Sequence, residues 1–366
     1  MRTWNCLNPT QIIFCENCAR NFDYRVYGRR ALIVCGARSA RLCGALDEVR
    51  ETLETQGISF VIFDRVENNP RVETCFMAGK LAREERVDFV IGIGGGSPLD
   101  AAKAIAAFAA NKYPDAESIY ATDVPHALPV IAIGTTAGTG SEVTQYAVLT
   151  VQTASTKKTV KSPSLFPKVA LLDPRYTATL PLRLTIATAV DAISHCIEGY
   201  CSVRASSYTD AIALRSMRML STALRKIQGG VLDDEVREDL LQASTMAGLV
   251  IAQTGTGFAH VLGYMLTFFE GFQHGEANAQ FLTDFTEAMG IARPDKERAI
   301  LHALGLSSTD EMRAWMRDLI PTRPHLTHEK VLQFTRISEQ SASLKNSVYV
   351  INSDELYGFY KQYADQ

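Results

Sequence analysis

One aspartate and three histidines are the residues of this sequence best suited to do chemistry together. Asp191 and His195 lie four residues apart in an apolar stretch without glycine or proline, so a helix there would place both side chains on one face. A carboxylate and an imidazole so placed can share a metal ion, although the pair alone would favour a polar contact on a helix surface. His260 and His274 follow downstream and extend the set to Asp-x3-His and His-x13-His. We interpret the four residues as a metal site.

The donor types restrict which metal such a site would hold. One hard carboxylate with three imidazoles suits Fe(II), Zn(II), Mn(II) or Ni(II), and it does not suit an ion that prefers thiolates. An ion of coordination number five or six would still have room for a substrate oxygen. Cys15 and Cys18 have the spacing of a zinc ribbon, but the sequence has no second pair to complete one.

Five segments, in the same order along the chain, resemble the iron-containing (group III) alcohol dehydrogenases. Residues 191–198, the Gly-Phe-Ala-His sequence that ends at His260, and the His-Gly-Glu-Ala-Asn sequence that begins at His274 resemble that family's metal-binding segments. Residues 94–106 and 135–144 resemble its cofactor-binding segments. The resemblance implies Fe(II) as the metal and a nicotinamide nucleotide as the cosubstrate.

The chain departs from the family pattern at two positions. Gly134 stands where the family usually has proline, so we expect a looser loop there. Tyr264 stands where many relatives have a histidine. Because Tyr264 lies four residues after His260, it should line the same site. A phenol, with a reference pKa of about 10, donates a hydrogen bond but does not carry protons near neutral pH.

The glycine-rich segment at residues 94–97 lies between an apolar run and an alanine-rich helical run. Glycines let the backbone approach phosphate oxygens, and a helix N-terminus offers free N–H groups. Pro98 suits the first helical turn, with Ser97 before it as the N-cap. The resemblance implies pyrophosphate contact at residues 94–97, adenosine contact at Thr135 and Thr136, and a turn near the cofactor at residues 138–141.

The end of the first strong strand bears on the choice between NAD(H) and NADP(H). An acidic residue there would bind the ribose hydroxyls and repel a 2′-phosphate. This chain has Gly36, followed by Arg38 and Ser39, which could meet a phosphate, so we favour NADP(H). We therefore assign these residues to cofactor binding: Gly36, Arg38, Ser39, Gly94, Gly95, Gly96, Ser97, Asp100, Thr135, Thr136, Gly138, Ser141 and Lys157.

The order of apolar runs predicts the fold class. Strand-like runs at 10–15, 30–36, 59–64, 88–94 and 128–133 alternate with helical ones, which favours a mostly parallel sheet covered on both faces. From about Pro181 the pattern is helical, with candidate helices at 183–200, 205–226, 234–253 and 257–269. We expect an α/β Rossmann-like domain at 1–178 and an all-α domain at 179–366, an architecture similar to that of dehydroquinate synthase.

Composition and charge are those of an ordinary soluble globular protein. Of the 366 residues 46% are hydrophobic and 21% charged, and the net charge of −3 gives no reason to expect nucleic acid or an anionic membrane as partner. The sequence shows neither a signal segment nor a membrane span, so we expect a cytoplasmic protein, as a homodimer or higher homo-oligomer.

Together the sequence favours a metal-dependent NAD(P)-linked oxidoreductase that interconverts a small alcohol or diol and its aldehyde, acting as an aldehyde reductase. Two alternatives remain open at this point. One is another enzyme of the same architecture, a glycerol dehydrogenase or a dehydroquinate-synthase-like lyase. The other is a non-catalytic nucleotide- or metal-binding relative. The aromatic residues around 258–272 suggest an apolar substrate, but helix packing would produce the same composition.

Overall fold

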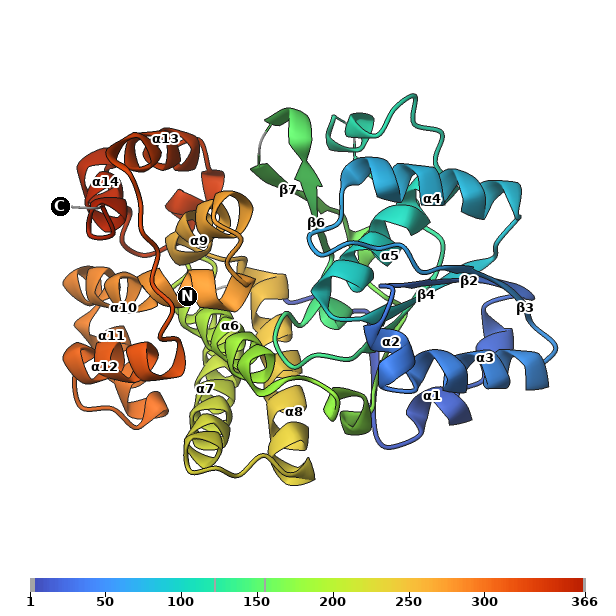
Figure 1. The fold of residues 1–366 in the computed structure, drawn as a ribbon, viewed down its shortest axis with the longest axis horizontal. Helices are drawn as coiled ribbons and strands as arrows, with labels where there is room; N and C mark the ends of the chain where they lie inside the picture. Colours follow the sequence, from blue (N-terminus) through green and yellow to red (C-terminus); the bar gives the residue numbers. More distant parts are fainter. Residues whose placement is uncertain (1–3, 122, 155, 365–366) are drawn as a thin grey trace. The chain divides into compact units, whose positions relative to one another are not determined.

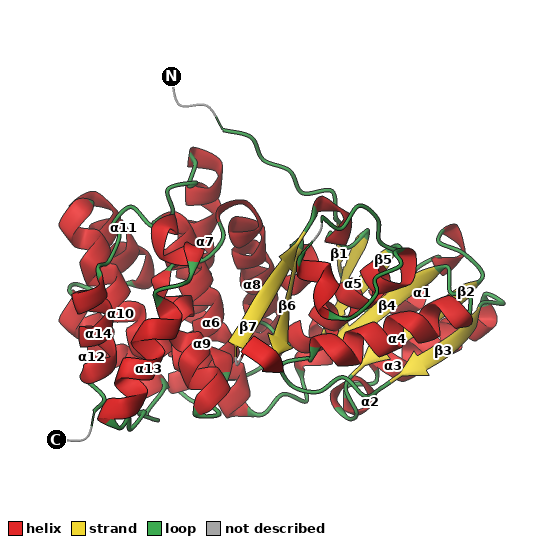
Figure 2. Cartoon of the chain, turned by 90° about the horizontal axis from the view of Figure 1, so that it is seen from above, coloured by secondary structure: helices red, strands yellow, loops and turns green. Residues whose placement is uncertain are grey.

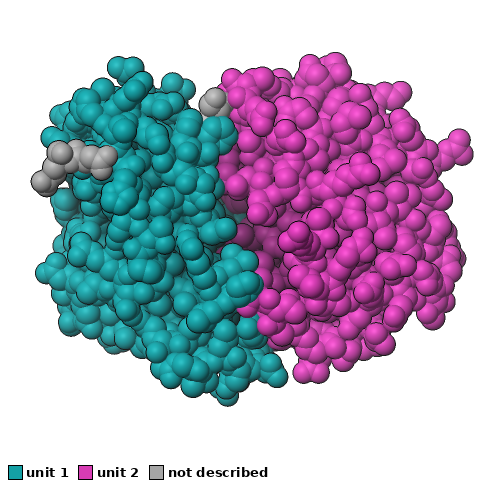
Figure 3. Space-filling view, in the orientation of Figure 1, with its two compact units in different colours: residues 1–6, 181–366 teal, residues 7–180 magenta. Residues whose placement is uncertain are grey.

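The computed structural model describes residues 4–121, 123–154 and 156–364. The chain divides into two compact units, which Figure 3 colours separately: Leu7–Leu180 form one, and Pro181–Gln366 with Met1–Cys6 form the other. Figure 2 shows that the strands belong to the first unit, whereas the second is built from helices.

The first unit is built on a parallel sheet. Within the described residues the sheet has six strands in the order β1-β8-β5-β4-β2-β3, and every neighbouring pair is parallel. A separate antiparallel pair joins β6 to β7. The strands are β1 (Gln11–Phe14), β2 (Arg30–Cys35), β3 (Ser59–Phe63), β4 (Phe89–Gly94), β5 (Val130–Gly134), β6 (Tyr146–Val151), β7 (Thr156–Lys161) and β8 (Val169–Leu172).

Helices cover both faces of this sheet, because its central strands are apolar along their whole length. All residues of β4 and β5 are buried, which is the pattern of a parallel strand enclosed on both sides. In Figure 1, α4 and α5 lie on one face and α1 to α3 on the other. The helices are α1 (Cys18–Asn21), α2 (Ser39–Leu42), α3 (Ala45–Thr55), α4 (Val72–Glu84) and α5 (Gly96–Ala110).

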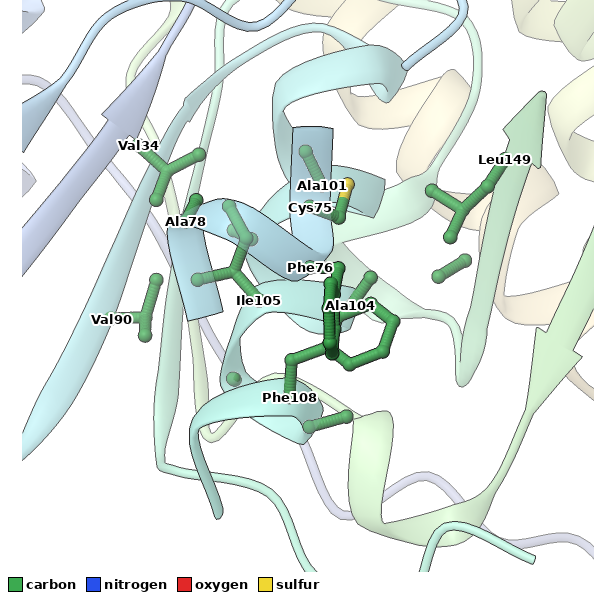
Figure 4. Close-up of a cluster of buried hydrophobic side chains, with 14 of the residues drawn as sticks. Val34, Cys75, Phe76, Ala78, Val90, Ala101, Ala104, Ile105, Phe108 and Leu149 are labelled. Atoms are coloured by element: carbon green, nitrogen blue, oxygen red, sulfur yellow. The ribbon is translucent and has the colours of Figure 1, made fainter. Parts of the chain in front are cut away.

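The apolar core beneath α4 and α5 holds these two helices against the sheet. Figure 4 shows Phe76 of α4 and Phe108 of α5 among the buried side chains of this cluster, with Val34 and Val90 from the strands. The two phenyl rings meet edge to face, with centroids 5.3 Å apart. This packing holds the body of α5, whose first turn belongs to the glycine-rich segment.

Several local predictions for this unit were wrong or incomplete. Ser97 is not the N-cap of α5: Gly95 holds that position, and the Ser97 hydroxyl instead accepts a hydrogen bond from the Asn69 amide at 3.1 Å. Gly134 pairs opposite Gly94 within the sheet, so the loosening expected there is not seen. Strands β6, β7 and β8 were not predicted. Strands β6 and β7 pair with each other in a separate two-stranded sheet, and β8 has only four residues, so each gives a weak signal in the sequence.

The second unit is a helical assembly around α6. This helix packs against α7, α8, α9 and α10, and its residues from Ala189 to Tyr200 are all buried. A capping box at Ser206 begins α7, and the Asp233 carboxylate caps α8. The helices are α6 (Leu182–Tyr200), α7 (Ser207–Gln228), α8 (Asp234–Thr254), α9 (Phe258–Phe269), α10 (His274–Ala292), α11 (Pro294–Leu304), α12 (Thr309–Leu319), α13 (His328–Ser338) and α14 (Ser353–Lys361).

Among the described residues, no single helix is long and apolar enough to cross a membrane. One sharply bent pair, α8 with α9, meets the test of length and composition only when the two helices are taken together.

Candidate metal centre and cofactor-binding turn

Asp191 and His195 project from one face of α6 into the interior of the helical unit. Only 2% of Asp191 and 4% of His195 is exposed. Asp191 Oδ1 lies 3.9 Å from Nε2 of His195, a contact that the spacing of four residues on a helix allows. Burying a carboxylate costs free energy unless the charge is paired, so Asp191 needs further partners or a bound cation.

Two further helices bring the remaining histidines to the same carboxylate oxygen. His260, near the start of α9, places Nε2 3.7 Å from Asp191 Oδ1, and His274, the first residue of α10, places Nε2 at 3.9 Å. Gly271 has a φ of +71°, a conformation that favours glycine, and it lies in the short connection between the two helices. The structure thus brings together all four side chains that the sequence pattern indicated.

The geometry and chemistry of these donors fit a divalent transition metal. Two ligands about 2.1 Å from one ion can lie up to about 4.2 Å apart, and all three oxygen–nitrogen distances are within that limit. One ligand atom from each of Asp191, His195 and His260 lies within 4.8 Å of the others. His274, with 27% of its side chain exposed, is the most accessible of the four. A carboxylate with three imidazoles is a donor set typical of Fe(II) or Zn(II).

The electrostatic environment keeps Asp191 in the form that binds a cation. Burial by itself would raise the pKa of the Asp191 carboxyl, but the three histidine rings and a hydrogen bond from Asn278 outweigh burial and lower that pKa. The Asn278 amide donates to Asp191 Oδ1 at 2.9 Å. The carboxylate is therefore ionised at neutral pH.

Tyr264 lies against the histidines, as its position on α9 predicted. Its ring stacks on His274 with centroids 5.4 Å apart and an interplanar angle of 15°, and it meets His260 edge to face at 6.4 Å. By contrast, Phe258 and Phe269 pack into the helical core, against Phe285 and Phe334 respectively. For these two phenylalanines, helix packing explains the aromatic composition.

Two residues beside the histidines were not singled out from the sequence. Asn278 lies one helical turn after His274, and Glu198 lies three residues after His195 on α6. Glu198 is fully buried and contacts the ring of His260. A count of polar residues at helical spacing from the proposed ligands would have found both.

The glycine-rich segment forms a tight turn between β4 and α5. Gly94 has a φ of +151°, and its carbonyl accepts a hydrogen bond from the Thr135 amide at 3.0 Å. A Cβ on Gly95 would lie 2.9 Å from Thr136, and one on Gly96 would lie 2.8 Å from Thr139. The turn and the segment after β5 therefore touch, and only glycine fits at the contact.

A buried polar network ties α5 to the segment that contains Gly138 and Ser141. Asp100 accepts a hydrogen bond from the Ser141 hydroxyl at 2.5 Å and another from the Val148 amide at 2.9 Å. Lys103, which was not among the predicted site residues, is fully buried and donates to Ser141 Oγ at 2.6 Å. Burial lowers the pKa of Lys103, and the nearby Asp100 opposes that shift. Asp100 therefore stabilises the segment that contains Gly138 and Ser141 through these hydrogen bonds.

The remaining candidates for cofactor binding lie in two places, after strand β2 of the parallel sheet and on strand β7 of the two-stranded sheet. Gly36 follows β2, Arg38 is exposed at the N-cap of α2, and Ser39 is the first residue of that helix. Since β2, β4 and β5 are neighbouring parallel strands, the segments after them lie at one edge of the sheet. Lys157 lies on β7 of the two-stranded sheet, opposite Thr150.

Comparison with known proteins gives consistent matches along the chain. The family model described as iron-containing alcohol dehydrogenase matches residues 9–174, and the model for the C-terminal part of the Fe-containing alcohol dehydrogenase family matches residues 185–326. Long-chain-alcohol dehydrogenase 1 of Geobacillus thermodenitrificans is 38% identical over 273 residues, which is 73% of this chain and 68% of that protein.

Solved structures agree with these matches. The crystal structure of an iron-containing alcohol dehydrogenase from Thermotoga maritima superposes with a TM-score of 0.90 at 35% identity, covering 98% of this chain and 99% of that one. Other relatives include both an NAD-dependent and an NADPH-dependent dehydrogenase, so the comparisons leave the nucleotide open.

Proposed function

This chain belongs to the iron-containing alcohol dehydrogenase family, and from that premise we propose that it reduces a small aldehyde to its alcohol with NADPH. The observation that carries the proposal is the convergence of three histidine Nε2 atoms on Asp191 Oδ1, at 3.7 to 3.9 Å. We propose the reductive direction because NADPH serves cells mainly as a reductant. We also propose that residues 1–178 bind the nucleotide and residues 179–366 hold the metal.

Each part of the chain has a definite task in this reaction. A divalent ion held by Asp191, His195, His260 and His274 would supply a Lewis acid for the alcohol or carbonyl oxygen, and a bound nicotinamide would carry the hydride. The glycine turn offers backbone N–H groups to the pyrophosphate at the start of α5. Asp191 supplies the negative charge that offsets the cation, and the Tyr264 ring holds His274 by stacking.

The experiment that tests the function is a substrate panel on metal-reconstituted protein. The protein is loaded with Fe(II), Zn(II) or Mn(II), and short aldehydes and the corresponding alcohols are assayed with NADPH and NADH. We expect metal-dependent turnover with aldehydes and a higher kcat/KM with NADPH. Absence of turnover under every combination would favour a non-catalytic relative. We expect the enzyme to be cytoplasmic and to form a homodimer or a larger homo-oligomer, which light scattering would measure.

Gly36→Asp should shift the cofactor preference from NADP(H) toward NAD(H). The new carboxylate would repel the 2′-phosphate, whereas it could bind the free ribose hydroxyls. The structure has room for it, because a Cβ at Gly36 would meet only the Val66 carbonyl oxygen, at an ordinary 3.5 Å. We expect the ratio of kcat/KM for NADPH over NADH to fall at least about tenfold, equivalent to about 1.4 kcal/mol. Wild-type protein that bound NADH tenfold more tightly than NADPH would contradict this assignment.

Tyr264→Phe should lower kcat or change its pH profile while leaving the metal content unchanged. The aromatic stacking on His274 is retained, so only the hydroxyl is lost. Loss of one neutral hydrogen bond to the substrate or its water costs about 0.5–1.5 kcal/mol, a few- to tenfold in rate. Tyr357→Phe, on α14, is the matched control and should leave kcat unchanged. Equal kinetics for both variants would assign Tyr264 to packing alone.

A further inference from the structure

Glu198 is a buried carboxylate whose two oxygens both face His260. Its exposed fraction is 0%, so its charge must be compensated by hydrogen bonds inside the protein. Oε1 accepts a hydrogen bond from the His260 backbone amide at 3.1 Å, and Oε2 is in close contact with Nδ1 of the same ring. A single side chain on α6 thereby anchors both the main chain and the imidazole of a residue on α9.

This contact determines which nitrogen of His260 is free to bind a cation. An ionised carboxylate only accepts hydrogen bonds, so Nδ1 beside it must carry the proton. In neutral imidazole the lone pair is then on Nε2, the atom 3.7 Å from Asp191 Oδ1. The ring is therefore held with its lone pair directed at the group of proposed ligands.

The backbone around α9 is adapted to the same contact. Gly257 is the N-cap of α9, and a Cβ there would lie 2.7 Å from Ser347 Oγ, 2.8 Å from Phe285 Cε2 and 3.3 Å from Glu198 Oε1. A side chain at this position would push the start of α9 away from Glu198. Glycine at this position therefore lets the start of α9 pack closely against its neighbours, Glu198 among them.

We propose that Glu198 is the positioning residue of the metal centre: through Nδ1 it fixes the tautomer and orientation of His260 so that Nε2 binds the divalent ion. This inference rests on the proposed metal-dependent function. A carboxylate that accepts from the second nitrogen of a metal-binding histidine also makes the imidazole a stronger donor. The four proposed ligands thus act together with a fifth residue that does not itself touch the ion.

Glu198→Gln tests this role, because the amide keeps the shape of the side chain and reverses one hydrogen bond. The amide oxygen still accepts from the His260 backbone, but the NH2 group now faces Nδ1 and donates to it. His260 is thereby driven to the Nε2–H tautomer, which places a proton where the ion should bind. We expect the Kd for Zn(II), measured against a competing chelator, to rise about 10- to 100-fold. The absorption bands of the Co(II)-loaded protein should also change.

Asp284→Asn is the matched control for the loss of a buried negative charge. Asp284 is only 8% exposed and lies on α10, but its carboxylate accepts from Arg313 and Gln362. We expect its Zn(II) affinity and Co(II) spectrum to equal those of the wild type. If Glu198 served in helix capping alone, Glu198→Gln would keep the bond to the His260 backbone and would change neither metal readout.

The outcomes separate this inference from the proposed function. Wild-type and Glu198→Gln proteins with equal Zn(II) affinity would overturn the role of Glu198 and leave the function standing. Wild-type protein that bound no divalent ion would overturn both. If Glu198→Gln does not fold, the ring ¹⁵N shifts of His260 in the wild-type protein decide: a proton on Nδ1 supports the assignment, and a proton on Nε2 contradicts it.

Discussion

His274→Ala is expected to lose at least about a thousandfold in kcat, equivalent to about 4 kcal/mol of transition-state stabilisation, while the protein stays folded. The variant removes one of four proposed ligands, and the ion that would activate the substrate oxygen is no longer held. His274 has 27% of its side chain exposed, so its truncation leaves little of a cavity. Metal content by atomic emission and kcat with the best aldehyde are the measurements.

His302→Ala is the control for the substitution itself, because His302 is an exposed histidine on α11. We expect wild-type activity and metal content from it. Full activity of wild-type protein after complete removal of metal would refute the Lewis-acid mechanism, whatever the result for His274.

Gly275→Ala is expected to lower both the metal affinity and the melting temperature. Gly275 is the second residue of α10, and a Cβ there would lie 1.8 Å from the Ala187 carbonyl oxygen and 3.1 Å from Asp191 Cβ. A backbone oxygen inside α6 cannot yield as a flexible side chain would, so α10 must move away. His274 would move with it, and the distance to Asp191 would grow.

The size of the effect follows from the cost of overpacking. Inserting a methyl group into a closely packed contact costs about 1–3 kcal/mol, and more where backbone must shift. We expect the melting temperature of the metal-free protein to fall by at least about 2–4 °C and the Kd for Zn(II) to rise more than tenfold. Scanning calorimetry and chelator competition measure these two quantities.

Gly358→Ala provides the comparison, since a Cβ on Gly358 of α14 would meet nothing within 4 Å. Alanine has the higher helix propensity, by about 1 kcal/mol, so this variant should be as stable as the wild type or more so. Wild-type stability and metal affinity in Gly275→Ala would show that α6 and α10 are not packed as closely as the structure has them.

The sequence by itself determined the elements whose signals are local. Strand β4 is a continuous apolar run that ends in glycines, and α6 is a long run without glycine or proline between Leu182 and Ile197. Both are patterns that one segment carries alone. The proximity of Asp191 and His195 could also be predicted, since two residues four apart on a helix lie on the same face. The alternation of strands and helices indicated the parallel sheet for the same reason.

Tertiary structure decided the features that depend on distant partners. Strand β7 is polar and half exposed, and it becomes a strand only by pairing with β6. The sequence placed Ser97 at the N-cap position, but its hydroxyl accepts a hydrogen bond from the amide of Asn69, 28 residues earlier. Glu198 contacts His260, which is 62 residues away in sequence. The apolar pattern along α6 does not predict which helix packs against the face that carries Glu198. Local propensity acts within a few residues, whereas a buried charge takes its partner from whichever chain segment packs against it.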